Sequence, residues 1–277
     1  MGKFDGILIC TDLDGTLMNS KKEISKENLD AIEYFKANGG LFTFITGRMP
    51  STSKKTCELI KPNIAFGCIN GGGVYDFEKQ DFLWLITLPN EHIELLEYID
   101  KKLPSVSIQI SAEKHILFAK DNSAMEYFRN ITGMPLLTCD YHNPGERVAK
   151  ILFGEDNEEI LMMVADLLDK HPLADKFKFV RSDKRFYEIL PKGISKASAM
   201  NKIVELFELD PSKTIAIGDY DNDIAMIEAA SVGVAVSNAC DNLKKVADYI
   251  TVSNDEHAIK KVIEDLEAGK ITCPRTL

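Results

Sequence analysis

Short apolar runs that alternate with amphipathic helical patterns constrain the fold of this chain most. Residues 7–10 form such a run, and after Ser25 the apolar residues recur at helical spacing until Gly39-Gly40. Further apolar runs at 41–45 and 64–69 follow with a helical pattern between them. Strands that alternate with helices over short loops are typical of a parallel sheet covered on both faces. The sequence therefore predicts an α/β fold with a Rossmann-like parallel sheet.

The middle of the chain has a different rhythm. Helical patterns there are followed by pairs of strand-like segments, such as 106–110 with 115–119 and 177–181 with 186–190. This order predicts an open, mainly antiparallel sheet with helices on one face. After Pro191-Lys192-Gly193 the first rhythm returns. We therefore expect a core made of residues 1–83 and 191–277, with an α+β domain inserted at 84–190.

Composition limits the partners and the location. The formal net charge is -10, and an acidic surface repels nucleic acid and anionic membranes. No apolar run approaches the length of a membrane span. The six cysteines form no CxxC pair, which favours reduced core thiols in a cytoplasmic protein. The sequence leaves open whether the protein is a monomer or a homodimer.

Polar residues follow three of the predicted strands. They are Asp12-Leu13-Asp14-Gly15-Thr16, Thr46-Gly47-Arg48 and Gly218-Asp219-Tyr220-Asp221-Asn222-Asp223. Ligands of open parallel sheets bind outside the carboxyl ends of the strands, so these segments should meet at one edge. Asp12, Asp14 and Asp219 would repel one another there unless a cation lay among them, and a carboxylate set suits Mg²⁺. The five histidines are scattered without metal-ligand spacing, which argues against zinc.

Each motif also has a simpler interpretation. Asp-x-Asp-Gly after a strand is a common turn, and Asp221 is expected to cap the helix that follows it. The spacing from Asp219 to Asp223 imitates an EF-hand loop, but that loop requires Gly and Glu where Ile224 and Ala230 stand. Lysines near helix starts, such as Lys196, are usually solvated. The ordered combination of the motifs at predicted element edges favours a functional site over four coincidences.

Together these residues resemble the four motifs of the haloacid dehalogenase superfamily of phosphatases. The segment 12–16 resembles its DxDGT motif, Thr46-Gly47-Arg48 its second motif, Lys196 its third and 218–223 its GDxxND motif. The insertion between the second and third motifs is similar to the large α/β cap of the Cof-type branch. The resemblance covers essentially the whole chain and implies a phosphatase that acts on small phosphorylated metabolites, with sugar phosphates favoured.

The resemblance implies a role for each acidic residue. Asp12 is expected to be the nucleophile that forms an aspartyl-phosphate, and Asp14 the general acid and base. Mg²⁺ is the implied cofactor, bound by Asp12, the Asp14 backbone carbonyl and Asp219, with Asp223 as a direct ligand or one shell further out.

It also implies the groups that hold the phosphate. These are the Thr46 hydroxyl, the Gly47 amide and the Asn222 side-chain amide. Lys196 is expected to neutralise charge on the phosphoryl group, and Arg48 to reach the substrate.

Two other functions fit the same motifs. A sugar phosphomutase of the phosphomannomutase type can share this core and cap, but it needs an activating bisphosphate. A non-catalytic sugar-phosphate sensor is disfavoured because Asp14 is present. Release of inorganic phosphate without an activator would distinguish a hydrolase from a mutase.

Overall fold

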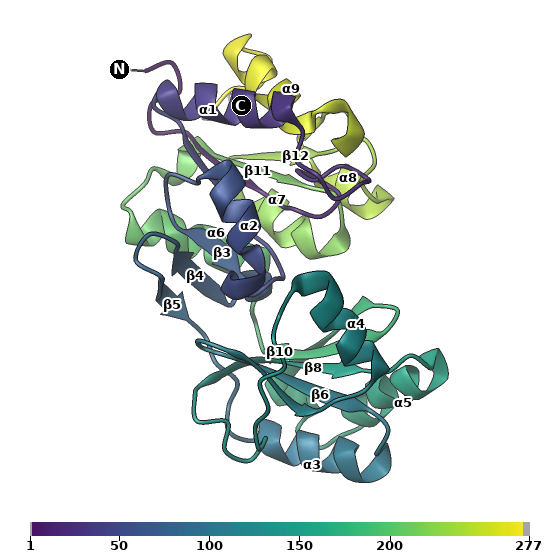
Figure 1. Ribbon diagram of the computed structural model, residues 1–277. Coiled ribbons are helices and arrows are strands. Elements are labelled where there is room, and N and C mark those ends of the chain that lie inside the picture. The colour runs from purple at the N-terminus through teal and green to yellow at the C-terminus, as the bar shows by residue number, and fades with distance from the viewer. Residues whose placement is uncertain (1, 274–277) are drawn as a thin grey trace. The chain divides into compact units, whose positions relative to one another are not determined.

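The computed structural model describes residues 2–273, and contacts within the chain divide it into two compact units (Figure 1). The first unit contains the residues up to Trp84 and those from Ser195 onward, and the second unit is Leu85–Ile194. The junctions expected from the sequence, at 83/84 and 190/191, lie close to these divisions. The second division falls after Ile194, beyond the last strand of the second unit, which ends at Pro191.

A five-stranded parallel sheet forms the centre of the first unit, in the order β13-β12-β11-β1-β2. Both faces of this sheet are buried, as a sheet covered on both sides requires: Ile9 lies in register with Phe42 on one face, and its chain neighbours Leu8 and Cys10 point to the other. Its strands are β1 (Leu8–Thr11), β2 (Leu41–Phe44), β11 (Thr214–Gly218), β12 (Val232–Ala235) and β13 (Tyr249–Ile250).

Two groups of helices cover this sheet. The helices are α1 (Lys26–Ala37), α2 (Pro50–Ile60), α6 (Lys196–Leu206), α7 (Ile224–Ala229), α8 (Asp241–Val246) and α9 (Ala258–Glu267). Helix α1 contacts α2 and α9, whereas α7 contacts α6 and α8 (Figure 1). Right-handed crossovers place these two groups on opposite faces of the sheet. As predicted, Ser25 caps α1, since its side chain accepts a hydrogen bond from the amide of Asn28 at 3.3 Å.

The apolar run at 64–69 does form a strand, but this strand belongs to a small antiparallel sheet beside β2 that the sequence analysis did not expect. It contains β3 (Phe66–Cys68), β4 (Gly73–Asp76) and β5 (Asp81–Leu85) in that order. A single parallel bridge between Ile45 and Gly67 joins it to the end of β2. Strands β4 and β5 were not expected, because they are too short for a clear period-2 pattern.

The second unit contains a five-stranded antiparallel sheet in the order β7-β6-β8-β10-β9. Apolar residues on one face of this sheet, including Ile108 and Ile110, pack with those of two helices in a single core. Its elements are α3 (His92–Lys102), β6 (Ser107–Ala112), β7 (Ile116–Lys120), α4 (Ser123–Thr132), β8 (Val148–Gly154), α5 (Glu158–Asp169), β9 (Phe177–Asp183) and β10 (Phe186–Pro191).

The expectation that all helices lie on one face of this sheet is wrong for α4. Helices α3 and α5 share the core face, but α4 lies on the other side (Figure 1). A side chain at Gly154 would meet Ser107 of the sheet and Met125 of α4, and Ser107 points away from the core face that Ile108 joins. The remainder of the α/β prediction, a parallel sheet with an inserted α+β unit, is confirmed.

None of the helices among residues 2–273 is long and apolar enough to cross a membrane.

Candidate active site

Asp12 and Asp219 lie next to each other at the carboxyl edge of the parallel sheet. Asp12 directly follows β1, Asp219 directly follows β11, and these strands pair in parallel with Thr11 opposite Ile217. The amide of Asp12 continues the ladder by donating to the Ile217 carbonyl at 2.9 Å. Two acidic residues more than 200 positions apart therefore meet because their strands are neighbours.

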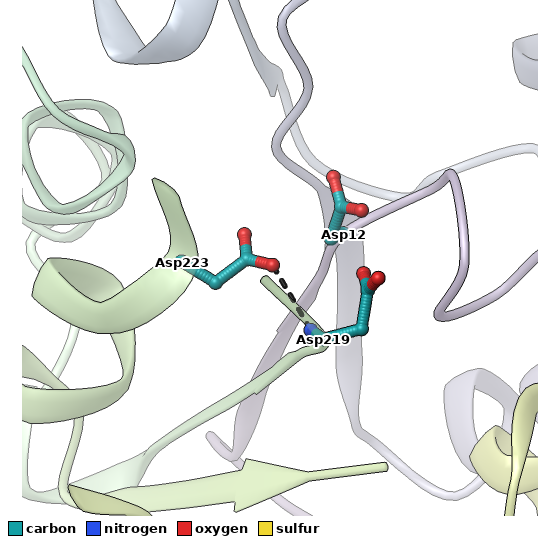
Figure 2. A group of neighbouring side chains, drawn as sticks. All are labelled: Asp12, Asp219 and Asp223. Carbon is teal, nitrogen blue, oxygen red and sulfur yellow. Dashed lines mark hydrogen bonds between the residues drawn. The ribbon is translucent and has the colours of Figure 1, made fainter. Parts of the chain in front are cut away.

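Asp223 joins them from a short 3₁₀ turn, Asp221–Asp223, that precedes α7. Its Oδ2 accepts hydrogen bonds from the amides of Asp219 at 3.0 Å and Tyr220 at 3.2 Å, so its carboxylate fixes the loop after β11. The three carboxylates of Asp12, Asp219 and Asp223 offer oxygens that all lie within 4.8 Å of one another (Figure 2). Asp221, expected to be the cap, instead accepts a hydrogen bond from the Asn242 side chain at 3.2 Å.

Lys196 lies in the first turn of α6 and is almost completely buried, with 2% of its surface exposed. Its ammonium contacts Oδ1 of Asp12 and Oδ1 of Asp223, each at 2.5 Å. A cation at a helix N-terminus opposes the helix dipole. Burial alone would lower the pKa of Lys196, but the charges of Asp12 and Asp223 outweigh burial and raise it above its ordinary value. The lysine therefore stays charged and bridges two carboxylates.

The turn after Asp14 lets the chain approach Asp219 closely. Gly15 has a φ of +89°, and a Cβ there would lie 2.4 Å from Asp219 Oδ2, so only glycine fits. Next to it, the Thr16 hydroxyl donates to Asp219 Oδ1 at 2.8 Å. The Asn238 side chain donates to the Gly15 carbonyl at 2.8 Å. Thr16 belongs to a recognised motif but had no assigned role, and no sequence signal pointed to Asn238.

The charge of this cluster suits a divalent cation. Burial raises the pKa of Asp12 to about 8 despite the opposing charge of Lys196, and the charge of Asp223 adds to the rise. Burial and then the charge of Asp223 also raise the pKa of Asp219. Three carboxylates against one ammonium leave excess negative charge in a buried place, and oxygen-only donors are what hard cations prefer. The residues present therefore fit Mg²⁺.

Asp14 lies outside this cluster and is held by two cations. Arg48 Nη2 donates to Asp14 Oδ1 at 2.8 Å and Oδ2 at 2.9 Å, and Arg48 Nε donates to Oδ2 at 3.1 Å. The ammonium of Lys22, which the sequence analysis did not single out, lies 3.1 Å from Oδ1. Burial opposes ionisation of Asp14, but the charges of Arg48 and then Lys22 outweigh burial and lower its pKa. Arg48 thus contacts an expected acid–base residue.

The remaining expected phosphate ligands lie on neighbouring loops of the first unit. Thr46 is buried just after β2, and its hydroxyl accepts a hydrogen bond from the Arg48 amide at 3.3 Å. A Cβ at Gly47 would lie 2.9 Å from the Asn70 side chain, so Asn70 borders this loop. Asn222 is exposed in the turn that carries Asp223. Asn70 follows β3 with a left-handed φ of 52°.

The sequence matches the family of haloacid dehalogenase-like hydrolases over residues 9–263. Among curated relatives, a Streptococcus pyogenes protein provisionally named a phosphatase is 30% identical over 270 residues, covering 92% of this chain and 97% of the relative. A 5-amino-6-(5-phospho-D-ribitylamino)uracil phosphatase of Bacillus subtilis is 27% identical over 265 residues, covering 93% of this chain and 96% of the relative.

Solved structures share the whole architecture. A haloacid dehalogenase-like hydrolase from Bacteroides thetaiotaomicron has a TM-score of 0.84 at 30% identity, over 93% of this chain and 98% of the other. A sugar phosphatase of the superfamily's subclass IIB has a TM-score of 0.77 at 23% identity, over 96% of this chain and all of the other. At 23% identity, the similarity to the sugar phosphatase shows a shared fold only.

Proposed function

Because the chain belongs to the haloacid dehalogenase-like hydrolases and is a phosphatase of that family, we propose that it is a magnesium-dependent enzyme that hydrolyses small phosphorylated metabolites through an aspartyl-phosphate on Asp12. The observation that carries the proposal is the environment of the Asp12 carboxylate. It lies 2.5 Å from the buried ammonium of Lys196 and within reach of Asp219 and Asp223.

The first step transfers the phosphoryl group to the protein. A carboxylate oxygen of Asp12 attacks phosphorus, the bond from phosphorus to the ester oxygen breaks, and Asp14 gives a proton to the departing alkoxide. The second step reverses the role of Asp14. It takes a proton from a water molecule whose oxygen attacks phosphorus, and the bond to Asp12 breaks to release inorganic phosphate and the free carboxylate.

The metal would be held by Asp12, Asp219 and the Asp14 backbone carbonyl. Asp223 has both oxygens engaged, by Lys196 and by two backbone amides, which supports a role in positioning Lys196 and the Asp219 loop. When bound, Mg²⁺ supplies positive charge that offsets repulsion among the carboxylates and on the phosphate. The chain's own contribution is a charged lysine beside the nucleophile, which remains cationic throughout.

The phosphate oxygens are proposed to accept hydrogen bonds from the Thr46 hydroxyl, the Gly47 backbone amide and the Asn222 side-chain amide. Arg48 is proposed to act near the substrate as well, at the position where it contacts Asp14. Donors aimed at the phosphoryl oxygens stabilise the charge that develops during transfer.

The substrate class proposed is the phosphomonoesters of sugars and related polyhydroxy compounds. The name of the Bacillus subtilis relative places its phosphate on a ribityl chain, which is an alkyl ester of this class. The proposal places the enzyme in the cytoplasm, where thiols remain reduced. All six cysteines are free thiols, which supports that location.

The experiment is a phosphate-release screen of the purified protein against alkyl phosphomonoesters, with Mg²⁺ present and no bisphosphate. We expect release of inorganic phosphate that stops with EDTA and returns with added Mg²⁺. Turnover that persists in EDTA would contradict the metal assignment. Isomerised sugar phosphate without phosphate release would contradict hydrolysis and favour a mutase.

A further inference from the structure

The turn that follows β3 has a strained backbone. Ile69, Asn70 and Gly71 all have left-handed φ angles, of +57°, +52° and +94°. A β-branched residue in this region is an outlier that persists only where its surroundings impose it. Ile69 is fully buried, so packing around its side chain holds the turn in this shape. Backbone strain of this kind gathers at functional sites, and the contacts of the turn show which site it serves.

Backbone hydrogen bonds fasten the turn to the loop after β2. The Asn70 amide donates to the Thr46 carbonyl at 3.0 Å, and the Ile69 amide donates to the Arg48 carbonyl at 3.1 Å. The Thr46 amide in turn donates to the Gly67 carbonyl of β3 at 3.0 Å. The strained turn therefore sets the position of the loop that is proposed to hold phosphate.

The Asn70 side chain lies against Gly47, the middle residue of that loop. A Cβ on Gly47 would lie 2.9 Å from Asn70 Oδ1 and 3.1 Å from Nδ2. The carboxamide thus occupies the side of Gly47 on which any other residue would carry its side chain. The backbone does not require this side chain, because a φ of +52° suits glycine at least as well, and glycines follow at positions 71–73.

We propose that Asn70 is a positioning residue of the phosphate site: its carboxamide packs against Gly47 and holds the Gly47 backbone amide directed at the phosphoryl oxygens. This inference rests on the proposed function, which assigns that amide to phosphate. The phosphoryl oxygens carry negative charge before, during and after transfer. Loss of the Asn70 side chain should therefore weaken binding of substrate and of inorganic phosphate alike, with a smaller effect on kcat.

The test removes the side chain and keeps the turn. Asn70→Gly takes away the carboxamide, and glycine adopts the left-handed φ without strain, so Tm should stay within about 3 °C of the original. In the full-length protein with Mg²⁺, isothermal titration calorimetry measures the Kd of inorganic phosphate. We expect it to rise about five- to ten-fold, the size of a weakened hydrogen bond to a charged group. KM for p-nitrophenyl phosphate should rise by a similar factor, and kcat should fall less than about three-fold.

A second variant separates the chemistry of the side chain from its shape. Asn70→Asp keeps the shape and also tolerates a left-handed φ, but it places negative charge against the loop. Inorganic phosphate should therefore bind this variant more weakly than it binds the glycine variant. The matched control is Glu208→Gly, an exposed position after α6 with a φ of +50°, which should change neither Kd nor KM.

Other outcomes overturn the proposal. An unchanged phosphate Kd in Asn70→Gly means that the side chain serves the turn alone. A fall in kcat with Kd and KM unchanged places Asn70 outside the phosphate site, and so does normal phosphate binding by Asn70→Asp. The proposed function fails separately: only retention of hydrolysis by Asp12→Asn, whatever the result at Asn70, would remove the premise.

Discussion

Lys196 shows at the residue scale how a buried charge is tolerated. Its ammonium is buried away from water and lies at the N-terminus of α6, where the helix dipole repels a cation. Both effects are unfavourable. Contacts to Asp12 and Asp223 compensate for them. Removing one partner of such a group leaves an uncompensated charge, so these residues form one electrostatic unit and changes in them should not be additive.

The first residue-scale prediction concerns the nucleophile. Asp12→Asn keeps the shape of the side chain but replaces the attacking oxygen with an amide, so kcat should fall by about 10³-fold or more. Steady-state phosphate release measures this, and circular dichroism should show an unchanged fold. Asp30→Asn, an exposed change on α1, is the matched control and should retain full activity. Near-normal turnover by Asp12→Asn would refute the assignment.

At the scale of elements, α9 is tied to the edge of the sheet through Asp265. Its buried carboxylate accepts hydrogen bonds from Lys261 at 2.6 Å and from the Tyr249 hydroxyl of β13 at 2.8 Å, and it pairs with Lys270 at 3.0 Å. Burial opposes ionisation, but these three partners outweigh it and lower the pKa of Asp265 to about 2. An ordinary aspartate titrates near a pKa of about 3.9 in an unfolded chain.

The sign of the pH dependence follows from these values. The folded protein binds a proton at Asp265 less readily than the unfolded chain, so ionised Asp265 stabilises the fold above about pH 4. This contribution is lost as the pH falls from about 4 to about 2. Asp265→Asn should therefore lower the free energy of unfolding by about 1–3 kcal/mol at pH 7, with a smaller difference near pH 3.

Urea unfolding curves at both pH values measure this difference. Glu264→Gln, on the adjacent exposed position of α9, is the control and should cost less than about 0.5 kcal/mol. A deficit for Asp265→Asn that stays constant from pH 7 to pH 3 would contradict the role of its ionised form.

The end of the η1 turn (Ile69–Gly71) lies directly against the start of α6. Gly71 has a φ of +94°, and a Cβ there would lie 1.7 Å from the Ser195 carbonyl, immediately before Lys196. Gly71→Ala must therefore move one of the two segments. We expect a loss of stability above about 2 kcal/mol, together with a fall in kcat because Lys196 shifts.

The control for this prediction is Gly269→Ala. Gly269 also has a positive φ, of +72°, but a Cβ there meets no atom within 4 Å. It should cost about 1 kcal/mol through backbone strain alone and leave kcat unchanged. Equal effects of the two changes on kcat would show that the contact with Ser195 does not matter for the site.

Local sequence patterns encode some elements of this fold and not others. Strands β1, β2 and β11 carry continuous apolar runs that end in polar motifs, so their positions and their shared edge follow from period and parallel topology. The β4–β5 hairpin and the face occupied by α4 depend on tertiary packing that no local period encodes. In the same way, Asp14 belongs to a recognisable motif, but its contact with Lys22 depends on a turn in which the Asn19 side chain accepts hydrogen bonds from the amides of Lys21 and Glu23.

For the whole molecule, the fit of the carboxylate cluster to Mg²⁺ predicts a gain in stability on binding. A ligand at 100 times its dissociation constant stabilises the folded state by about 2.7 kcal/mol. For a unit of the size of the first one, which contains the cluster, this stabilisation corresponds to a rise in its Tm of about 5–10 °C. Thermal melting with and without Mg²⁺ measures it. Asp219→Asn should abolish most of the rise, and an equal rise in that variant would place the ion elsewhere.

The central position of β1 in the sheet has a consequence for how the chain is made. One neighbour of β1 is β2, which is about 30 residues away, but the other is β11, which begins at Thr214. During synthesis on the ribosome, the whole of Leu85–Ile194 emerges before β11 exists, while one hydrogen-bonding edge of β1 is still bare. Until β11 is synthesised, the unpaired edge of β1 can therefore pair with strands of other chains, which favours aggregation. The unit Leu85–Ile194 has time to fold during this interval.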